Sequence, residues 1–207
     1  MIRPPGRDGV AFSEGSDGDL RHDREARIEV ARSLGLPSDW AVVRQVHRSD
    51  VTRVAGPGDA GEADALWTTQ RRLPLAIFTA DCFGVVLSSE GAVGVAHAGW
   101  RGARARVVFR LREEMTEAGH EPQRAAVGPG IGPCCFEVGN EVAAEFPTTA
   151  ATTTWGTTSV DLPGAIGSQL AGLETWSLDA CTRHDQGWFS HRADGTDKRL
   201  AAIGWLP

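Results

Sequence analysis

Three residues of this 207-residue sequence stand where apolar runs end and have side chains that can bind a metal or take part in catalysis. They are His47, Cys82 and His97. Short apolar, β-branched runs predict buried strands in a sheet that is covered on both faces. The strands predicted around these residues are 40–47, 75–79 and 92–96, with a further run at 83–87. A side chain placed where such a strand stops lies at the rim of a sheet. The sequence therefore predicts a reactive site built from strand ends that are far apart in the chain.

The residue types of this set match zinc, which prefers imidazole and thiolate ligands. Three protein ligands leave a fourth position open for water or substrate, which is typical of catalytic sites. His47, Cys82 and His97 are too far apart in sequence to form the local clip of a zinc finger. Spacing alone leaves three interpretations: a shared metal ion, core side chains with satisfied polar groups, or a metal-free hydrolase with Cys82 as nucleophile and His97 as base.

A glycine-flanked turn, Gly-Trp-Arg-Gly at 99–102, directly precedes the strongest predicted helix, 103–118. A helix N-terminus offers free backbone N–H groups and a favourable dipole to an anion, and Arg101 could grip two oxygens of a phosphate. The alternative is an arginine that lies over Trp100 at the surface. Both interpretations are compatible with the sequence.

A second glycine-rich segment, the loop 128–135, has the sequence Gly-Pro-Gly-Ile-Gly-Pro-Cys-Cys. Its backbone could wrap a ligand, with Gly130 and Cys135 as candidate substrate contacts. Alternatively, the glycines serve turn geometry, and the adjacent Cys134 and Cys135 are small buried hydrophobic residues that do not chelate one metal together.

Composition restricts the class of protein. With 41% hydrophobic and 23% charged residues the chain is typical of globular proteins, and its net charge of −6 argues against nucleic-acid binding. No apolar segment reaches the length of a membrane span, and the N-terminus lacks the apolar core of a signal peptide. Four cysteines without a secretory signal suggest reduced thiols. We therefore expect a cytoplasmic protein, a monomer or weak homodimer, that does not bind membranes.

Other elements follow from periodicity and from turn residues. Ala26, Val30 and Leu34 share one face of a predicted helix, 23–34, which Gly35 ends. A weak helix is expected after Asp161. We expect a loose arm at 1–20, an extension of the strand 40–47 at 51–54, loops at 56–62 and 148–158, a modest helix at 140–146, and strands at 63–68, 125–127, 176–178, 188–191 and 200–205.

Taken together, six segments resemble the YfiH, or laccase-domain, family, formerly labelled multicopper polyphenol oxidase. They are RQVH (44–47), ADALWTT (63–69), TADC (79–82), AHAGWRG (96–102), GPGIGPCCFEVG (128–139) and the tail CTRHDQGWFSHRADGTDKRLAAIGWL (181–206). The match covers about residues 40–206 in the right order. The resemblance implies a single α/β domain of mixed β-sheets flanked by helices.

The same resemblance implies a zinc ion held by two histidines and one cysteine, which map onto His47, Cys82 and His97. It also implies purine nucleoside chemistry: phosphorolysis of adenosine, inosine, guanosine and methylthioadenosine, together with adenosine deamination. Two features depart from the family pattern. In the shortened N-terminal arm, the Arg-x-Gly-Gly-Val-Ser segment and the Asn-Leu motif are replaced by FSEGSDGDLRHD (12–23), and Arg48 stands where the family commonly has glycine.

The older oxidase label implies copper, which composition can test. A blue copper site together with a trinuclear copper cluster needs more imidazole ligands than the six histidines present. A blue copper site also commonly has an axial methionine ligand, for which only Met1 and Met115 exist. Three histidines, His22, His120 and His184, stand in polar, turn-like sequence, and His191 is ambiguous. A mononuclear copper oxidase and a non-catalytic binding module are the remaining alternatives to a zinc-dependent nucleoside enzyme.

Overall fold

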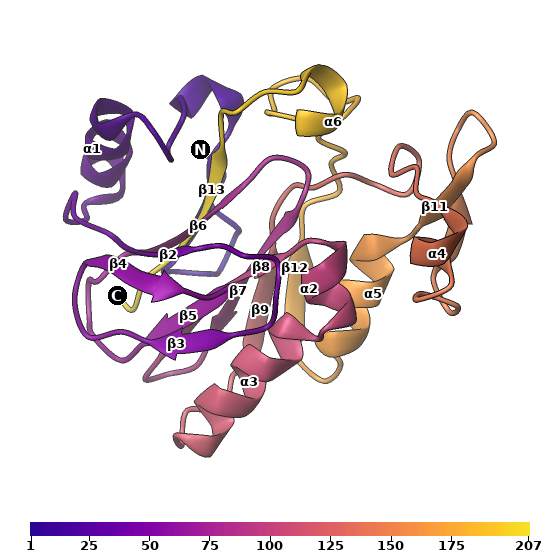
Figure 1. Cartoon of the computed structure of the whole chain (residues 1–207). Helices are drawn as coiled ribbons and strands as arrows, with labels where there is room; N and C mark the ends of the chain where they lie inside the picture. Colours follow the sequence, from indigo (N-terminus) through magenta and orange to yellow (C-terminus); the bar gives the residue numbers. More distant parts are fainter.

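Two β-sheets packed face to face form the centre of the protein in a computed structural model that describes residues 1–207 (Figure 1). Both sheets are mixed. The five-stranded sheet runs, from edge to edge, β1 (Val10–Phe12), β13 (Leu200–Gly204), β6 (Leu75–Thr79), β2 (Ala41–Arg44) and β4 (Gly58–Glu62). The six-stranded sheet runs β12 (Glu174–Ser177), β9 (Arg124–Val127), β7 (Phe83–Ser88), β8 (Val93–Ala98), β5 (Ala65–Thr68) and β3 (Val51–Arg53).

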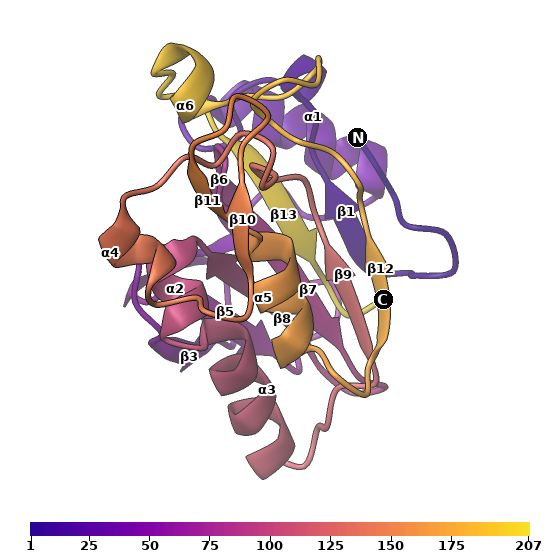
Figure 2. The same cartoon turned by 90° about the vertical axis from the view of Figure 1, so that its right-hand side faces the viewer.

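Helices cover the outer faces of both sheets, so the molecule has four layers. Figures 1 and 2 show α1 (Arg24–Leu34) and α3 (Val107–Glu117) on opposite sides of the sheets. The shorter helices are α2 (Trp100–Arg104), α4 (Asn140–Ala143), α5 (Leu162–Gln169) and α6 (His191–Asp194). The expected class, α/β with mixed sheets flanked by helices, is confirmed. None of these helices has the length and apolar character needed to cross a bilayer.

Three apolar clusters hold the layers together, and the largest lies between the six-stranded sheet and α3 and α5. A second cluster fills the space between the two sheets, and a third packs α1 on the five-stranded sheet. Gly84 of β7 allows the sheets to approach closely, because a Cβ there would lie 2.3 Å from that of Ala202. The burial of both sheet faces explains why the central strands are continuous apolar runs.

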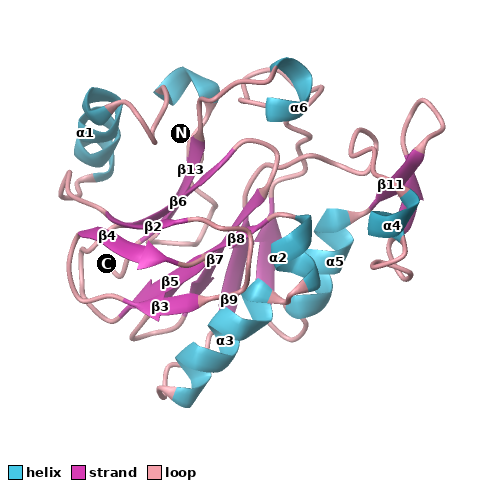
Figure 3. Cartoon of the chain, in the orientation of Figure 1, coloured by secondary structure: helices cyan, strands magenta, loops and turns pink.

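Several strand predictions were wrong in instructive ways. Residues 51–54 do not extend β2, because β3 belongs to the other sheet. The predicted loop 56–62 contains β4, an exposed edge strand whose Gly and Asp residues gave no strand pattern, and the predicted loop 148–158 forms the hairpin β10 (Ala150–Thr152)–β11 (Thr158–Val160). No strand forms at 188–191. As Figure 3 shows, the chain between β12 and β13 is mostly loop, interrupted by α6.

Two further differences concern the helix after 102 and the N-terminal arm. The predicted helix 103–118 is interrupted between α2 and α3, where Arg106 has a left-handed backbone with φ of 61°. The arm is not loose: β1 pairs with β13, and its residues Val10, Ala11 and Phe12 are buried. In contrast, α1 has the predicted bounds, because Asp23 caps its N-terminus and Gly35 ends it in the left-handed conformation.

Candidate active site at the junction of the two sheets

The side chains of His47, Cys82 and His97 meet where the two sheets come together, and we call this set the triad. One ligand atom from each residue lies within 4.8 Å of the others. Cys82 lies in the crossover from β6 of one sheet to β7 of the other, and the pairing of Phe83 with Ala98 places it beside the end of β8. His97 is inside β8 rather than beyond its end, and the His47 ring meets the His97 ring edge-on at 4.7 Å between centroids.

Asp64 holds both histidines in place, a role that the sequence analysis missed. Its carboxylate is fully buried and lies 2.8 Å from Nδ1 of His97, which leaves Nε2 of that ring free for a ligand. The same carboxylate accepts backbone N–H groups of His47 at 2.9 Å and Arg48 at 2.6 Å. These contacts support the left-handed backbone of His47, whose φ is 60°. A carboxylate on the far side of an imidazole is a common partner of metal-binding histidines.

The charges of the triad favour a thiolate. Burial raises the pKa of Cys82, but the charge of His97 and hydrogen bonds with both imidazoles outweigh this and lower the pKa to about 6. Burial lowers the pKa of His97, but Cys82 and Asp64 outweigh that and raise it to about 9. Both shifts favour the thiolate–imidazolium form of the pair, and a metal cation bound here would take the place of the imidazolium proton.

The donor set fits a zinc ion. Two imidazoles and one thiolate are ligands that zinc prefers, and no fourth cysteine, histidine or carboxylate joins the cluster, so the arrangement is that of an open site. Gly99 is required by the site, because a Cβ there would lie 2.7 Å from the sulphur of Cys82. The structure therefore contains a cysteine–histidine cluster able to bind a metal.

A cavity of about 390 Å³ opens onto the triad. Four arginines line it and give it an electropositive rim: Arg21, Arg101, Arg192 and Arg199. Its apolar lining includes Phe78, Trp100, Ile131, Phe136 and Leu162. Aromatic and aliphatic surfaces beside a few convergent charges are typical of sites for small organic anions and nucleosides. Of these four arginines only Arg101 stands in a motif that predicts a ligand contact, since the other arginines come from segments that give no signal on their own.

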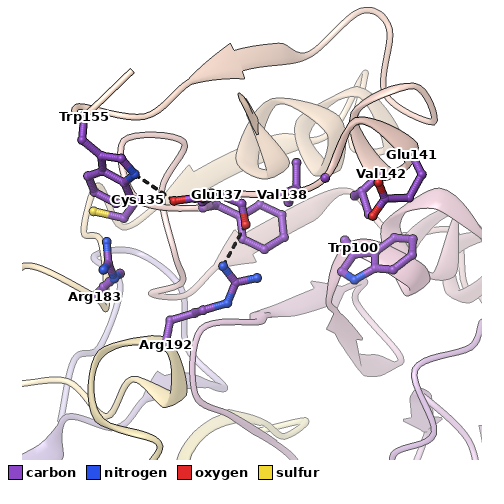
Figure 4. Close-up of a pocket in the computed structure, with 11 residues that line it drawn as sticks. Trp100, Cys135, Glu137, Val138, Glu141, Val142, Trp155, Arg183 and Arg192 are labelled. Atoms are coloured by element: carbon purple, nitrogen blue, oxygen red, sulfur yellow. Dashed lines mark hydrogen bonds between the residues drawn. The ribbon is translucent and has the colours of Figure 1, made fainter. Parts of the chain in front are cut away.

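The remaining predicted contacts fall in different places. Arg101 lines the cavity, and its guanidinium also lies over the Trp100 ring at 4.3 Å, so both interpretations of this residue describe part of its environment. Gly130 does not line the cavity and packs on the Phe83 ring, where a Cβ would lie at 2.6 Å. Cys135 is also absent from it and lines a neighbouring pocket (Figure 4). Arg48 is exposed and does not line the cavity.

Asp81 is positioned next to the triad by an unusual backbone, with φ of 87°, so the chain bends between it and Cys82. Both of its oxygens are engaged, one by the Thr182 hydroxyl at 2.8 Å and the other by the backbone N–H of Arg192 at 2.7 Å. Asp81 therefore fixes the C-terminal segment against the site. These bonds leave it poorly placed to act as a general acid or base.

Two mixed sheets with this cluster at their junction place the chain in the laccase-like family: it belongs to the family described as multi-copper polyphenol oxidoreductase laccase, which matches residues 10–207. Two relatives carry another name. Purine nucleoside phosphorylase ORF3 of Streptomyces griseus is 41% identical over 196 residues, which cover 87% of this chain and 80% of that protein. A purine nucleoside phosphorylase of Deinococcus radiodurans is 38% identical over 213 residues, which cover 96% and 83%.

Solved structures agree on the fold. YlmD from Geobacillus stearothermophilus has a TM-score of 0.83 at 26% identity and covers 96% of this chain and 92% of its own. The hypothetical protein YfiH of Bacillus licheniformis has a TM-score of 0.86 at 23% identity over the same shares of the two chains, 96% and 92%. The resemblance to the YfiH family seen in the sequence is thus confirmed.

Proposed function

We propose that this protein is a zinc-dependent purine nucleoside phosphorylase that also deaminates adenosine. The observation that carries the proposal is the triad at the base of a cavity with an arginine-rich rim and an aromatic wall. The names of the Streptomyces and Deinococcus relatives support nucleosides and phosphate as substrates. Adenosine, inosine, guanosine and methylthioadenosine are the nucleosides we expect it to accept.

The chain's own residues bind the two substrates. In phosphorolysis a phosphate oxygen bonds to the ribose C1′, the N-glycosidic bond breaks, and its electron pair passes to the purine. Phe78, Trp100 and Phe136 offer the apolar surfaces for a nucleoside. For phosphate we favour Arg21 and Arg101, because neither guanidinium makes a hydrogen bond within the protein, whereas that of Arg192 donates to the carbonyl of Glu137 at 2.8 Å.

The triad would hold the zinc ion, with Asp64 orienting His97 behind it. Bound there, zinc supplies Lewis acidity, which activates water for deamination and stabilises negative charge that develops on the substrate. Gly99 keeps the space next to the Cys82 sulphur free. The hydrogen bonds from Thr182 and Arg192 to the Asp81 carboxylate hold the cavity wall in position beside the triad.

The test measures inosine cleavage across a phosphate titration and adenosine-to-inosine conversion in phosphate-free buffer. Cys82→Ala and His47→Ala should lower both activities by more than about a hundredfold. Mutating even a residue that only hydrogen-bonds a metal ligand lowers metal affinity or activity by about 10- to 100-fold. His22→Ala is the matched control, because His22 is exposed and pairs with an aspartate outside the cavity.

Two outcomes would contradict the proposal. Wild-type protein that turns over nucleosides after complete removal of metal would favour the cysteine hydrolase, with Cys82 as nucleophile and His97 as base. Oxidation of phenols that consumes oxygen in proportion to bound copper would favour the oxidase label. The structure gives no support to a multicopper centre, since no metal-binding cluster contains more than two histidines.

A further inference from the structure

A second cluster of metal-binding side chains lies outside the triad cavity, none of whose lining residues belongs to it. It consists of Cys134, Cys135, Cys181 and His184, and we call it the tetrad. One ligand atom from each residue lies within 4.8 Å of all the others, and all the cysteines of the chain are free thiols. In Figure 4 the sulphur of Cys135 lies between Trp155 and Arg183, at the side of the neighbouring pocket away from Trp100.

Parallel pairing of β9 and β12 brings these residues together. Cys134 and Cys135 follow β9, Cys181 and His184 follow β12, and a bridge between Gly130 and Cys181 continues the pairing beyond the strands. The adjacent cysteines lie in a tight turn in which the N–H groups of Cys135 and Phe136 both donate to the carbonyl of Gly132. This turn directs both sulphurs toward His184, contrary to the expectation that neighbouring cysteines would serve only as apolar filler.

Two of the distances within the tetrad match those of a tetrahedral metal site. Nδ1 of His184 lies 3.6 Å from the sulphur of Cys134 and 3.4 Å from that of Cys135. With zinc–sulphur bonds of about 2.3 Å and zinc–nitrogen bonds of about 2.0–2.1 Å, a tetrahedron has sulphur–nitrogen edges of about 3.6 Å. The two measured edges therefore need little change to accept an ion.

Further hydrogen-bonding groups contact two of the candidate ligands, His184 and Cys181. Nε2 of His184, the ring nitrogen that faces away from the sulphurs, lies 3.1 Å from one oxygen of Asp185. The other oxygen of Asp185 accepts the backbone N–H of Cys181 at 2.7 Å. The N–H of Gly132 donates to the sulphur of Cys181 at 3.3 Å. A carboxylate behind the histidine and an N–H on a sulphur are the partners that orient ligands in metal sites.

We propose that the tetrad is a structural zinc site with three thiolates and one imidazole as ligands. Four protein ligands leave no position for substrate, which distinguishes it from the open triad. Binding releases the protons of the three thiols and joins the turn at 132–136 to the segment 181–185. Thr182, inside that segment, holds Asp81 next to Cys82, so the second metal stabilises the wall of the first site.

The experiment isolates the tetrad by working in Cys82→Ala protein, which lacks a triad ligand. The reduced protein is stripped of metal, titrated with Co²⁺ and followed by absorption spectroscopy, with zinc content measured in parallel. We expect one metal per chain, with the strong visible bands of tetrahedral cobalt and a sulphur-to-cobalt charge-transfer band about three times that of a single thiolate. Adding Cys181→Ala should remove both signals.

A milder pair of variants guards against misfolding. His184→Ala removes an exposed side chain, and in the Cys82→Ala background it should weaken cobalt binding at least about tenfold and shift the visible bands. His22→Ala is the control, because the side chains of His22 and His184 are equally exposed, at 57%, and each pairs with an aspartate. His22→Ala should leave the titration unchanged.

Three results would overturn the proposal. The first is a reduced Cys82→Ala protein that binds neither cobalt nor zinc. The second is a cobalt spectrum that His184→Ala leaves unaltered. The third is a freshly purified, metal-free chain in which two of the three tetrad cysteines are joined in a disulphide, detected as a loss of two hydrogens by mass spectrometry, because the cluster would then be a redox pair.

Discussion

Cys82 and Cys134 are both half-buried thiols close to an imidazole, yet their surroundings shift their acidity in opposite directions. At Cys82, burial is outweighed by the charge of His97, and the pKa falls to about 6. At Cys134, burial and the neighbouring sulphurs of Cys135 and Cys181 act together and raise the pKa to about 12. A cysteine–histidine contact alone therefore does not define a reactive thiol, because the neighbouring charges decide its protonation.

The two clusters also differ in what stands behind the imidazole. The His97–Asp64 pair is buried, with side-chain exposures of 3% and 0%, whereas the His184–Asp185 pair is exposed, at 57% and 42%. The triad has three candidate ligands beside a cavity with an arginine-rich rim, whereas the tetrad has four, three of which, Cys134, Cys181 and His184, line a separate cavity of about 660 Å³. This contrast is the one that we propose between a chemical site and a structural one, and three measurements test it.

The largest difference should appear in the alkylation of metal-stripped, reduced protein by iodoacetamide. At pH 7 a thiol with a pKa of about 6 is mostly thiolate, whereas one with a pKa of about 12 is thiolate in only about one molecule in 100,000. Since nucleophilicity falls with pKa, with a Brønsted slope of about 0.4–0.5, the net advantage of Cys82 is about a hundredfold. Peptide mass spectrometry over time measures both rates.

The pH profile provides the control. The rate at Cys82 should rise through about pH 6 and then level off, because His97, with its pKa raised to about 9, stays charged over that interval. The rate at Cys134 should still be rising at the alkaline end. Equal rates at neutral pH would mean that the imidazolium does not stabilise the Cys82 thiolate.

The sequence predicted the triad but not what supports it. His47, Cys82 and His97 were visible because apolar strands end at or near each of them. Asp64 was not, because a lone acidic residue between two alanines gives no signal until β5 and the turn at 46–48 are placed side by side. Its position therefore depends on tertiary structure that no local pattern encodes.

The tetrad illustrates a different limit. Cys181 and His184 are three positions apart, a spacing typical of metal ligands, and Cys134 and Cys135 are adjacent; these were the local signals available. The pairing partner was hidden, because it depends on the parallel alignment of β9 and β12, whose sequences are short and ordinary. Likewise, β4 was missed because an exposed edge strand needs no apolar alternation, whereas β6 and α1 were found because burial and capping leave clear patterns.

The second prediction compares the two aspartates. Asp64→Asn keeps the size of the side chain but turns an N–H group toward backbone donors, and it should lower metal affinity at the triad by about 10- to 100-fold. Asp185→Asn should lower metal affinity at the tetrad only a few-fold, because its carboxylate is exposed, and should leave nucleoside turnover unchanged. Competition with a chromophoric zinc chelator measures both affinities.

The free energy of unfolding offers an independent test of the role of Asp64. The pKa of Asp64 is lowered: burial raises it, but the hydrogen bond from His97 and the N–H groups of Arg48 and His47 outweigh burial. Its contribution to stability is therefore present above the unfolded value of about 3.9 and is lost as the pH falls through the folded-state pKa. Asp64→Asn should unfold more easily at neutral pH and differ less from wild type in acid. An equal loss at all pH values would mean that the carboxylate charge contributes nothing.

The smallest effect separates the two arginines that lie over tryptophan rings. Arg101 covers Trp100 at 4.3 Å beside the triad, and Arg183 covers Trp155 at 4.5 Å beside the tetrad. If Arg101 binds phosphate, Arg101→Ala loses a charge-assisted contact of about 1.5–3 kcal/mol, and its exposure favours the lower value. The KM for phosphate in inosine cleavage should then rise about tenfold, while zinc content stays intact and adenosine deamination in phosphate-free buffer changes less. Arg101→Lys should recover part of the loss, since an ammonium does not grip two oxygens.

The control is Arg183→Ala, which removes the same kind of stacked arginine away from the triad cavity and should leave the KM for phosphate unchanged. If both variants raise it equally, or if phosphorolysis and deamination fall together in Arg101→Ala, the phosphate is held by other residues of the rim.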